Sequence, residues 1–154
     1  MMISTKRCVI RFFSEEDVYS FMTYHNNLEW MQYQGFKGLT EQEYRDQLLA
    51  PLPFSDGRQL AIIDHTTQEL IGDIYLKQES DCFWLGYSIA PKFSRQGYAF
   101  EAIQAIITYL KTNNCQTIKA GVLPENKASI KLLKKLGFSN VLTTEEEQVY
   151  VLNL

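Results

Sequence analysis

The segment from Trp84 to Tyr109 constrains the fold most, because it joins a strand, a glycine-bearing turn and an amphipathic helix. Its first part, up to Ile89, is apolar and aromatic apart from two small residues, which predicts a mostly buried strand. Pro91 ends this strand, since proline cannot donate to the next rung of a ladder. After a short turn and Gly97, apolar residues recur at helical steps: Ala99, Ala102, Ile103, Ile106, Ile107 and Leu110.

A strand that turns through glycine into a helix leaves the first backbone N–H groups of that helix without partners. Those donors, together with the helix dipole, favour an anion. We therefore interpret the corner around Gly97 as a phosphate-binding site. Strand–turn–helix units with one glycine are common, so the pattern alone also fits an ordinary structural turn.

Length and composition predict one domain over residues 1–154, with an ordinary hydrophobic fraction of 45%. A net charge of −3 argues against a nucleic-acid binder, which needs a basic face. Cys8, Cys82 and Cys115 are odd in number and widely spaced, which favours reduced thiols over a disulfide or zinc site. We expect no metal, no membrane partner and a cytoplasmic location, because neither ligand spacing nor a signal-peptide or membrane-spanning run is present.

The remaining pattern predicts an α+β chain in the order β-α-α-β-β-β-α-β-α-β-β. Ser14 and the Thr40–Glu43 capping box open the first two helices, and Gly137 ends the fourth. Between the first two helices, the segment 28–39 is irregular and aromatic, so its rings either line a substrate pocket or pack in the core. The strands are expected at 7–13, 59–64, 69–77, 84–89, 117–123, 139–143 and 148–152.

This order, with SRQGYAFEA at 94–102 and PENKASIKLLKKLGF at 124–138, resembles the GNAT superfamily of acetyl-CoA-dependent N-acetyltransferases. The resemblance covers essentially the whole chain. It is closest to the Rim-type branch, which includes ribosomal-protein N-terminal acetyltransferases. It implies a mixed, mostly antiparallel sheet of about seven strands with four helices, splayed between the fourth and fifth strands.

The resemblance also implies the residues that bind acetyl-CoA. Gly97 and Ala99 match the family motif Gln/Arg-x-x-Gly-x-Gly/Ala, whereas Ser94 departs from its first position. Asn126 matches an asparagine facing the cofactor arm, and it also fits a plain helix cap. Lys131 matches a basic position near the nucleotide phosphates, or is a solvated helix lysine. The expected cofactor contacts are Ile89, Ala90, Arg95, Gln96, Gly97, Tyr98, Ala99, Phe100, Asn126 and Lys131, with a backbone N–H near Ile89 polarising the thioester carbonyl.

Catalysis requires removal of a proton, because an amine of pKa about 10.4 is charged at pH 7. Trp84 stands where Rim-type proteins often carry Glu, and Leu133 stands where other members carry an acid tyrosine. Ser129 matches the Rim-type serine, which protonates the leaving thiolate, anchors a water or simply faces the core. Asp73 is our first choice of base, and a water chain without a dedicated base is the alternative. The other carboxylates considered are Glu29, Glu79 and Asp81.

These features predict an N-acetyltransferase in which an amine attacks acetyl-CoA directly in a ternary complex. Ser129, Asn126 and Asp73 are the expected catalytic residues, and Trp30, Tyr33 and Trp84 the expected acceptor-binding residues. The acceptor is a protein N-terminus, an amino acid, a polyamine or another small amine. The alternatives are an acyl-CoA-binding or sensing module without turnover, and a plain interaction domain. A homodimer through an edge strand is expected by analogy of fold alone.

Overall fold

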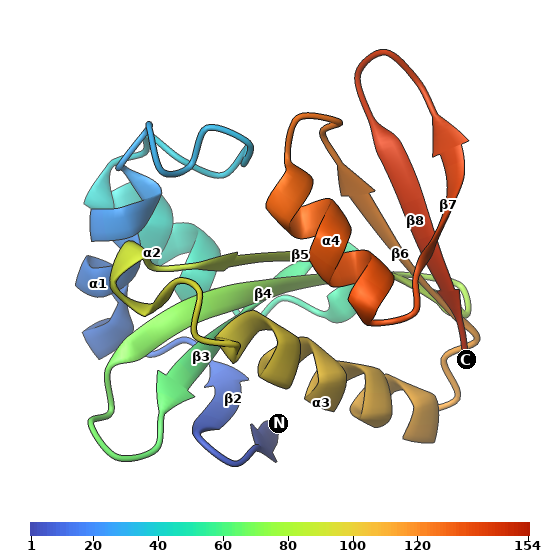
Figure 1. Cartoon of the computed structure of the whole chain (residues 1–154). Helices are drawn as coiled ribbons and strands as arrows, with labels where there is room; N and C mark the ends of the chain where they lie inside the picture. The colour runs from blue at the N-terminus through green and yellow to red at the C-terminus, as the bar shows by residue number, and fades with distance from the viewer.

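In the computed structural model, which describes residues 1–154, eight strands form one mixed sheet with helices on both faces (Figure 1). The four helices and two single 3₁₀ turns connect the strands. In chain order the elements are β1 Met2–Ser4, β2 Cys8–Phe12, α1 Glu15–His25, α2 Glu41–Leu49, η1 Phe54–Asp56, β3 Arg58–Asp64, β4 Leu70–Glu79, β5 Cys82–Ile89, η2 Pro91–Phe93, α3 Tyr98–Thr112, β6 Thr117–Val122, α4 Lys127–Lys135, β7 Ser139–Thr143 and β8 Gln148–Asn153.

The sheet has the order β1-β2-β3-β4-β5-β6-β8-β7, and only β5 and β6 run parallel. Their pairing extends over three residues of each strand, from Cys82 opposite Thr117 to Trp84 opposite Lys119. Beyond Trp84 the two strands separate, whereas β4 stays paired with β5 as far as Ile89. The predicted splay between these strands is therefore confirmed, and it opens the sheet where Tyr87 and Ile89 lie.

The expected α+β class, the four helices and the mixed sheet of about seven strands are confirmed, and the sheet has eight strands. The additional strand is β1, which pairs antiparallel with β2 from Met2 opposite Arg11 to Ser4 opposite Val9. Three residues are too few to show an alternating pattern, so this edge strand was not predicted.

Each face of the sheet has its own apolar core. Helices α3 and α4 cover one face, where Ile103, Ile106 and Leu133 are fully buried against strand residues such as Ile74. Helices α1 and α2 cover the other face, where Phe21 and Tyr44 pack together with ring centroids 5.5 Å apart. No helix is both long and apolar enough to cross a membrane.

Candidate active site

The turn into α3 presents six consecutive backbone N–H groups without partners. The N–H groups of residues 95–100 donate no hydrogen bond within the chain, whereas those of Ser94 and Glu101 donate to Pro91 and Gly97. Arg95 and Gly97 have positive φ angles of 60° and 81°, so the chain curls around the corner. Such a concave run of N–H groups at a helix N-terminus is suited to a phosphate-sized anion.

Arg7, which precedes β2, braces this corner. Its Nη1 donates to the Gln96 carbonyl at 3.0 Å, and its Nε donates to the Glu101 carboxylate at 2.7 Å. Its guanidinium also lies 4.0 Å from the centroid of the Tyr98 ring. Burial disfavours the charged Glu101 carboxylate, but hydrogen bonds from Thr5 and Arg7 outweigh it and lower the pKa of Glu101. The sequence offered no local sign of this contact, because the partners are about ninety residues apart.

Two cavities meet at the splay between β5 and β6. The larger cavity, about 530 Å³, lies between the 27–34 loop, the end of β5, Ala99 of α3 and the start of α4. The smaller cavity, about 230 Å³, lies between β5 and β6, and its rim includes Glu146 and Glu147 of the β7–β8 turn. Five residues line both cavities, so the two are continuous at this point: Tyr33, Gln34, Tyr87, Asn126 and Ser129.

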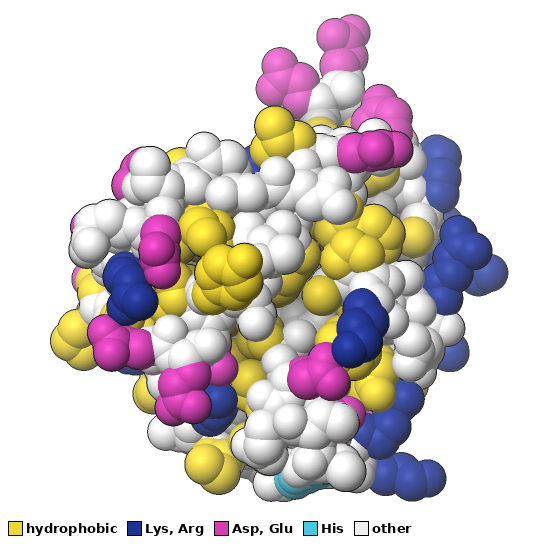
Figure 2. Space-filling model, turned by 90° about the vertical axis from the view of Figure 1, so that its left-hand side faces the viewer, with side chains coloured by type: hydrophobic (Ala, Val, Ile, Leu, Met, Phe, Trp, Pro, Cys, Tyr) yellow, Lys and Arg dark blue, Asp and Glu magenta, His cyan; other side chains and the backbone are white.

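Figure 2 shows the face of the molecule that is on the left in Figure 1, with apolar side chains gathered across its middle. Acidic side chains stand at its protruding top, which is the end of the β7–β8 hairpin in Figure 1. Apolar side chains such as Ile89 and Leu132 line the larger cavity, and Glu146 and Glu147 line the smaller one. Such an arrangement suits a ligand with an apolar arm at the centre and a polar group at the rim.

The free edge of β5 faces the larger cavity. The Ala90 N–H donates to the Ile71 carbonyl of β4 at 2.8 Å, so it has no donor left for a ligand. Because backbone groups alternate along a strand, the N–H of Ile89 points to the opposite edge, toward the splay. The Trp30 indole crosses this edge and donates to the Ile89 carbonyl at 2.8 Å, which fixes the aromatic loop over the cavity. The Ile89 N–H, which we expect to polarise the thioester carbonyl, therefore lies on the unpaired edge of β5. Ala90, by contrast, lines neither cavity.

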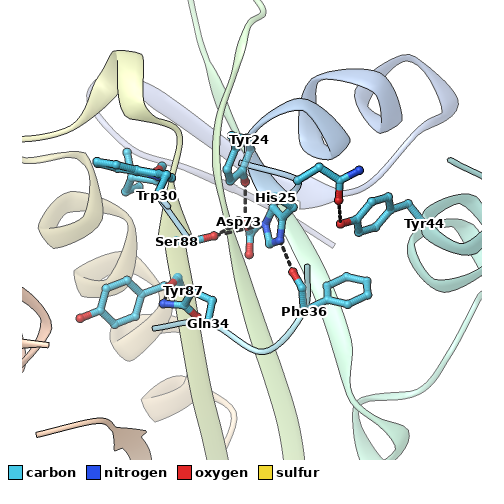
Figure 3. A network of polar contacts seen from close by, with 11 residues as sticks. Tyr24, His25, Trp30, Gln34, Phe36, Tyr44, Asp73, Tyr87 and Ser88 are labelled. Carbon is cyan, nitrogen blue, oxygen red and sulfur yellow. Dashed lines mark hydrogen bonds and ion pairs between the residues drawn. The ribbon is translucent and has the colours of Figure 1, made fainter. Parts of the chain in front are cut away.

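Three polar side chains converge on the Asp73 carboxyl of β4 (Figure 3). Ser88 Oγ donates to Asp73 Oδ2 at 2.6 Å, His25 Nε2 lies 2.8 Å from the same oxygen, and the Tyr24 hydroxyl donates to it as well. Asp73 is only 3% exposed and lines neither cavity. Ser88 does line the larger cavity, so it is the member of this cluster that connects the carboxylate to the site.

The hydrogen bonds of His25 require an additional proton in this cluster. Its Nδ1 lies 2.5 Å from the Phe36 carbonyl, and its Nε2 faces the Asp73 carboxylate, so both ring nitrogens meet an acceptor. A neutral imidazole has only one N–H. The cluster therefore contains either an imidazolium beside a carboxylate, or a neutral imidazole beside a protonated carboxyl. Burial and then the nearby Asp73 charge raise the pKa of Tyr24, so its hydroxyl remains a donor.

The first turn of α4 closes the junction from the other side. The Asn126 side chain accepts from the Ser129 backbone N–H at 3.2 Å, so it caps α4 while lining both cavities. The Ser129 hydroxyl lies 2.5 Å from the Tyr87 hydroxyl of β5. Burial raises the pKa of Tyr87 to about 12, although the hydrogen bond with Ser129 acts in the opposite direction.

Several residues that we expected to bind the cofactor or the acceptor line neither cavity. Trp84 lines neither cavity: its indole donates to Glu79 at 3.1 Å, since residue 84 lies where β5 is still paired with β6. Lys131 is exposed and also lines neither cavity. Arg95 is exposed on the corner, and Phe100 lies beneath the Lys135 ammonium, 4.5 Å from it. Trp30 and Tyr33 do line the larger cavity.

The sequence reading missed His25 and Ser88 as parts of the site. Its one available signal was that Asp73 and Ser88 interrupt two apolar strands, and these two residues are directly paired in the β4–β5 register. The position of His25 depends on the packing of α1 on the sheet, which no local pattern predicts.

Residues 7–139 match the family described as "Acetyltransferase (GNAT) domain". The uncharacterized N-acetyltransferase p20 of Bacillus licheniformis is 32% identical over 142 residues, covering 87% of this chain and 80% of that protein. Ribosomal protein uS5-alanine N-acetyltransferase of Escherichia coli is 45% identical over 56 residues, covering 36% of this chain and 29% of that protein.

A solved structure of RimL, a ribosomal L7/L12 acetyltransferase in complex with coenzyme A, has the same fold. Its TM-score is 0.82 at 15% identity, covering 100% of this chain and 98% of that chain. The likeness to the Rim-type branch expected from the sequence is thus confirmed. The matched residues include strands β2–β6 and all four helices, and therefore both sides of the splay, so the chain belongs to the GNAT family of N-acetyltransferases.

Proposed function

We propose that this enzyme transfers the acetyl group of acetyl-CoA to a primary amine by direct attack within a ternary complex. The observation that carries the proposal is the run of six unpartnered N–H groups at residues 95–100, adjoining the larger cavity at Ala99. This corner suits the pyrophosphate, since backbone donors at a helix N-terminus bind phosphate oxygens without a lysine or arginine. The solved RimL structure with the same fold is a complex with coenzyme A, which supports the same class of ligand.

The larger cavity suits the pantetheine arm and the thioester. Its walls include Ile89 on the free edge of β5, and Ala99 at the start of α3. The Ile89 N–H is the donor proposed to stabilise the negative charge that develops on the thioester oxygen. Arg95 and Lys131, both exposed, remain candidates only for the outer phosphates.

Trp30 and Tyr33, which line the larger cavity, are proposed to bind the acceptor amine. The smaller cavity is proposed as a second route by which a reactant enters the site. Trp84 is omitted, because it does not reach either cavity. The acceptor classes remain a protein N-terminus, an amino acid, a polyamine or another small amine.

Asp73 is proposed as the proton acceptor, acting through Ser88. The ammonium proton passes to Ser88 Oγ while the Ser88 proton passes to Asp73 Oδ2, 2.6 Å away. The amine nitrogen then attacks the thioester carbon, and the C–S bond breaks as the carbonyl re-forms. The arrangement with His25 as imidazolium leaves Asp73 as the carboxylate that this step needs. Ser129 and Asn126 lie where the two cavities meet, on the α4 side of the reacting groups.

Two measurements test this function in sequence. Calorimetric titration with acetyl-CoA should show binding, and no heat at millimolar acetyl-CoA would refute the assignment of the corner. Thiol release is then followed with an alanine-initiated peptide, a free amino acid and spermidine. Turnover with one of them, lost in Asp73→Asn but with acetyl-CoA affinity retained, supports the full proposal. Binding without release in any amine assay indicates an acyl-CoA-binding module instead.

A further inference from the structure

Tyr87 places a second hydroxyl against Ser129 at the meeting point of the two cavities. The residues come from different elements, β5 and α4, which separate on either side of the splay. Their hydroxyl oxygens are 2.5 Å apart, and the Tyr87 hydroxyl also lies 3.4 Å from the Ser129 carbonyl. Figure 3 shows the Tyr87 hydroxyl pointing away from the Asp73 cluster, so it is not part of the amine side of the network.

The two hydroxyls differ in acidity, which gives their hydrogen bond a direction. A phenol is a stronger acid than an alkyl hydroxyl, which favours Tyr87 as the donor and Ser129 Oγ as the acceptor in this pair. Ser129 then has its own proton free to point into the cavities. The Tyr87 hydroxyl is largely buried, which raises its pKa to about 12 and keeps it protonated at neutral pH.

No other side chain at the junction is a comparable proton donor. Of the five residues that line both cavities, Gln34 and Asn126 carry amides, which are not acids in this pH range. Tyr33 is 37% exposed, and its hydroxyl makes no hydrogen bond to Ser129. Leu133, one turn beyond Ser129, is fully buried and has no proton to give.

We propose that Tyr87 and Ser129 form a two-hydroxyl relay that protonates the leaving thiolate, an inference that rests on the proposed acetyl transfer. As the C–S bond breaks, its electron pair stays on sulfur. Ser129 gives its proton to that sulfur and takes the phenolic proton of Tyr87. The resulting phenolate regains a proton from water in the smaller cavity, which Tyr87 also lines. The attacking nitrogen loses its second proton to solvent as the amide forms, which balances the proton that water returns to the phenolate. The products are the amide, the free thiol and one released proton, the one that passed from the ammonium to Asp73.

A double-mutant cycle tests the relay, using acetyl-CoA and whichever of the three assayed amines turns over. Tyr87→Phe and Ser129→Ala should each lower kcat on the order of 10²-fold, with the KM for acetyl-CoA little changed. The double variant should be no slower than the slower single variant, because two members of one relay fail together. Tyr33→Phe serves as the matched control: it removes a hydroxyl from the same junction, and its effect should multiply with that of Ser129→Ala.

A solvent deuterium isotope effect on kcat provides the second readout. The wild type should show an effect that decreases in Tyr87→Phe, since the relay moves two protons in one step. The relay would be overturned if the losses of kcat in the Tyr87→Phe and Ser129→Ala variants multiply in the double variant. It would also be overturned if the Tyr87→Phe variant keeps the wild-type kcat. Either result would leave the acetyl transfer itself intact, because wild-type turnover and acetyl-CoA binding are measured separately.

Discussion

Gly97 is the single residue on which the anion corner depends most directly. Its φ is +81°, in the left-handed region that residues with a side chain rarely adopt. Space is not the constraint, because a Cβ at this position would meet nothing closer than the Arg7 guanidinium at 3.5 Å. The conformation itself is the constraint, and it sets the curl that points the N–H groups of residues 95–100 to one side.

Gly97→Ala should therefore weaken coenzyme binding without a steric clash. An L-residue held left-handed costs about 1–2 kcal/mol, which either lowers the melting temperature by a few degrees or relaxes the corner and lowers affinity for CoA roughly tenfold. Thermal unfolding and calorimetry measure the two outcomes on one sample. Gly35→Ala is the control, since Gly35 has open space around it and no positive φ. Identical behaviour of the two variants would show that the corner does not need this backbone conformation.

The start of α1 is an element whose stability depends on pH. The Asp17 carboxylate accepts from the Ser14 backbone N–H at 2.8 Å and from Arg11 Nη1 at 2.7 Å. Burial disfavours the charged form, but the hydrogen bonds from Arg11 and Ser14 outweigh it and lower the pKa of Asp17. The element matters to the site because His25, at the other end of α1, bonds to Asp73.

Asp17→Asn should cost about 1–2 kcal/mol of stability at pH 7, and the loss should shrink in acid. Since the folded-state pKa lies below the unfolded value of about 3.9, the unfolded chain binds more protons between the two. The stabilisation is thus complete above about pH 5 and is lost as pH falls through the lowered pKa. Urea unfolding at pH 7 and pH 3 tests this, with the exposed Glu16→Gln as control. If the stability difference between Asp17→Asn and the wild type is the same at pH 7 and pH 3, the prediction is contradicted.

The elements were predictable wherever one local pattern decided them. The apolar stripe of α3 and the Thr40–Glu43 capping box of α2 are both found as expected. The site was less predictable, because its geometry comes from contacts between distant elements. The Tyr87–Ser129 contact spans 42 residues, and the His25–Asp73 contact spans 48. Trp84, which we expected at the acceptor site, lines neither cavity, because the splay begins only after this residue.

At the scale of the whole molecule, the reaction centre is accessible from two sides. The larger cavity opens between the aromatic loop and α4, and the smaller one opens between β5 and β6 under the β7–β8 turn. Two reactants can thus occupy the site together and meet beside Tyr87 and Ser129. A covalent acetyl-cysteine is not supported by the arrangement, since all three cysteines are buried and none lines either cavity.

Initial-rate kinetics should accordingly show a ternary complex. With the amine that turns over, double-reciprocal plots at several fixed acetyl-CoA concentrations should intersect, because both reactants must be bound before the C–S bond breaks. Parallel lines are the signature of a covalent acetyl-enzyme. Mass spectrometry of the protein incubated with acetyl-CoA alone gives an independent check, and it should find no acetylated side chain at the splay. Parallel plots together with an acetylated Ser88 or Ser129 would replace direct attack by a two-step transfer through that serine.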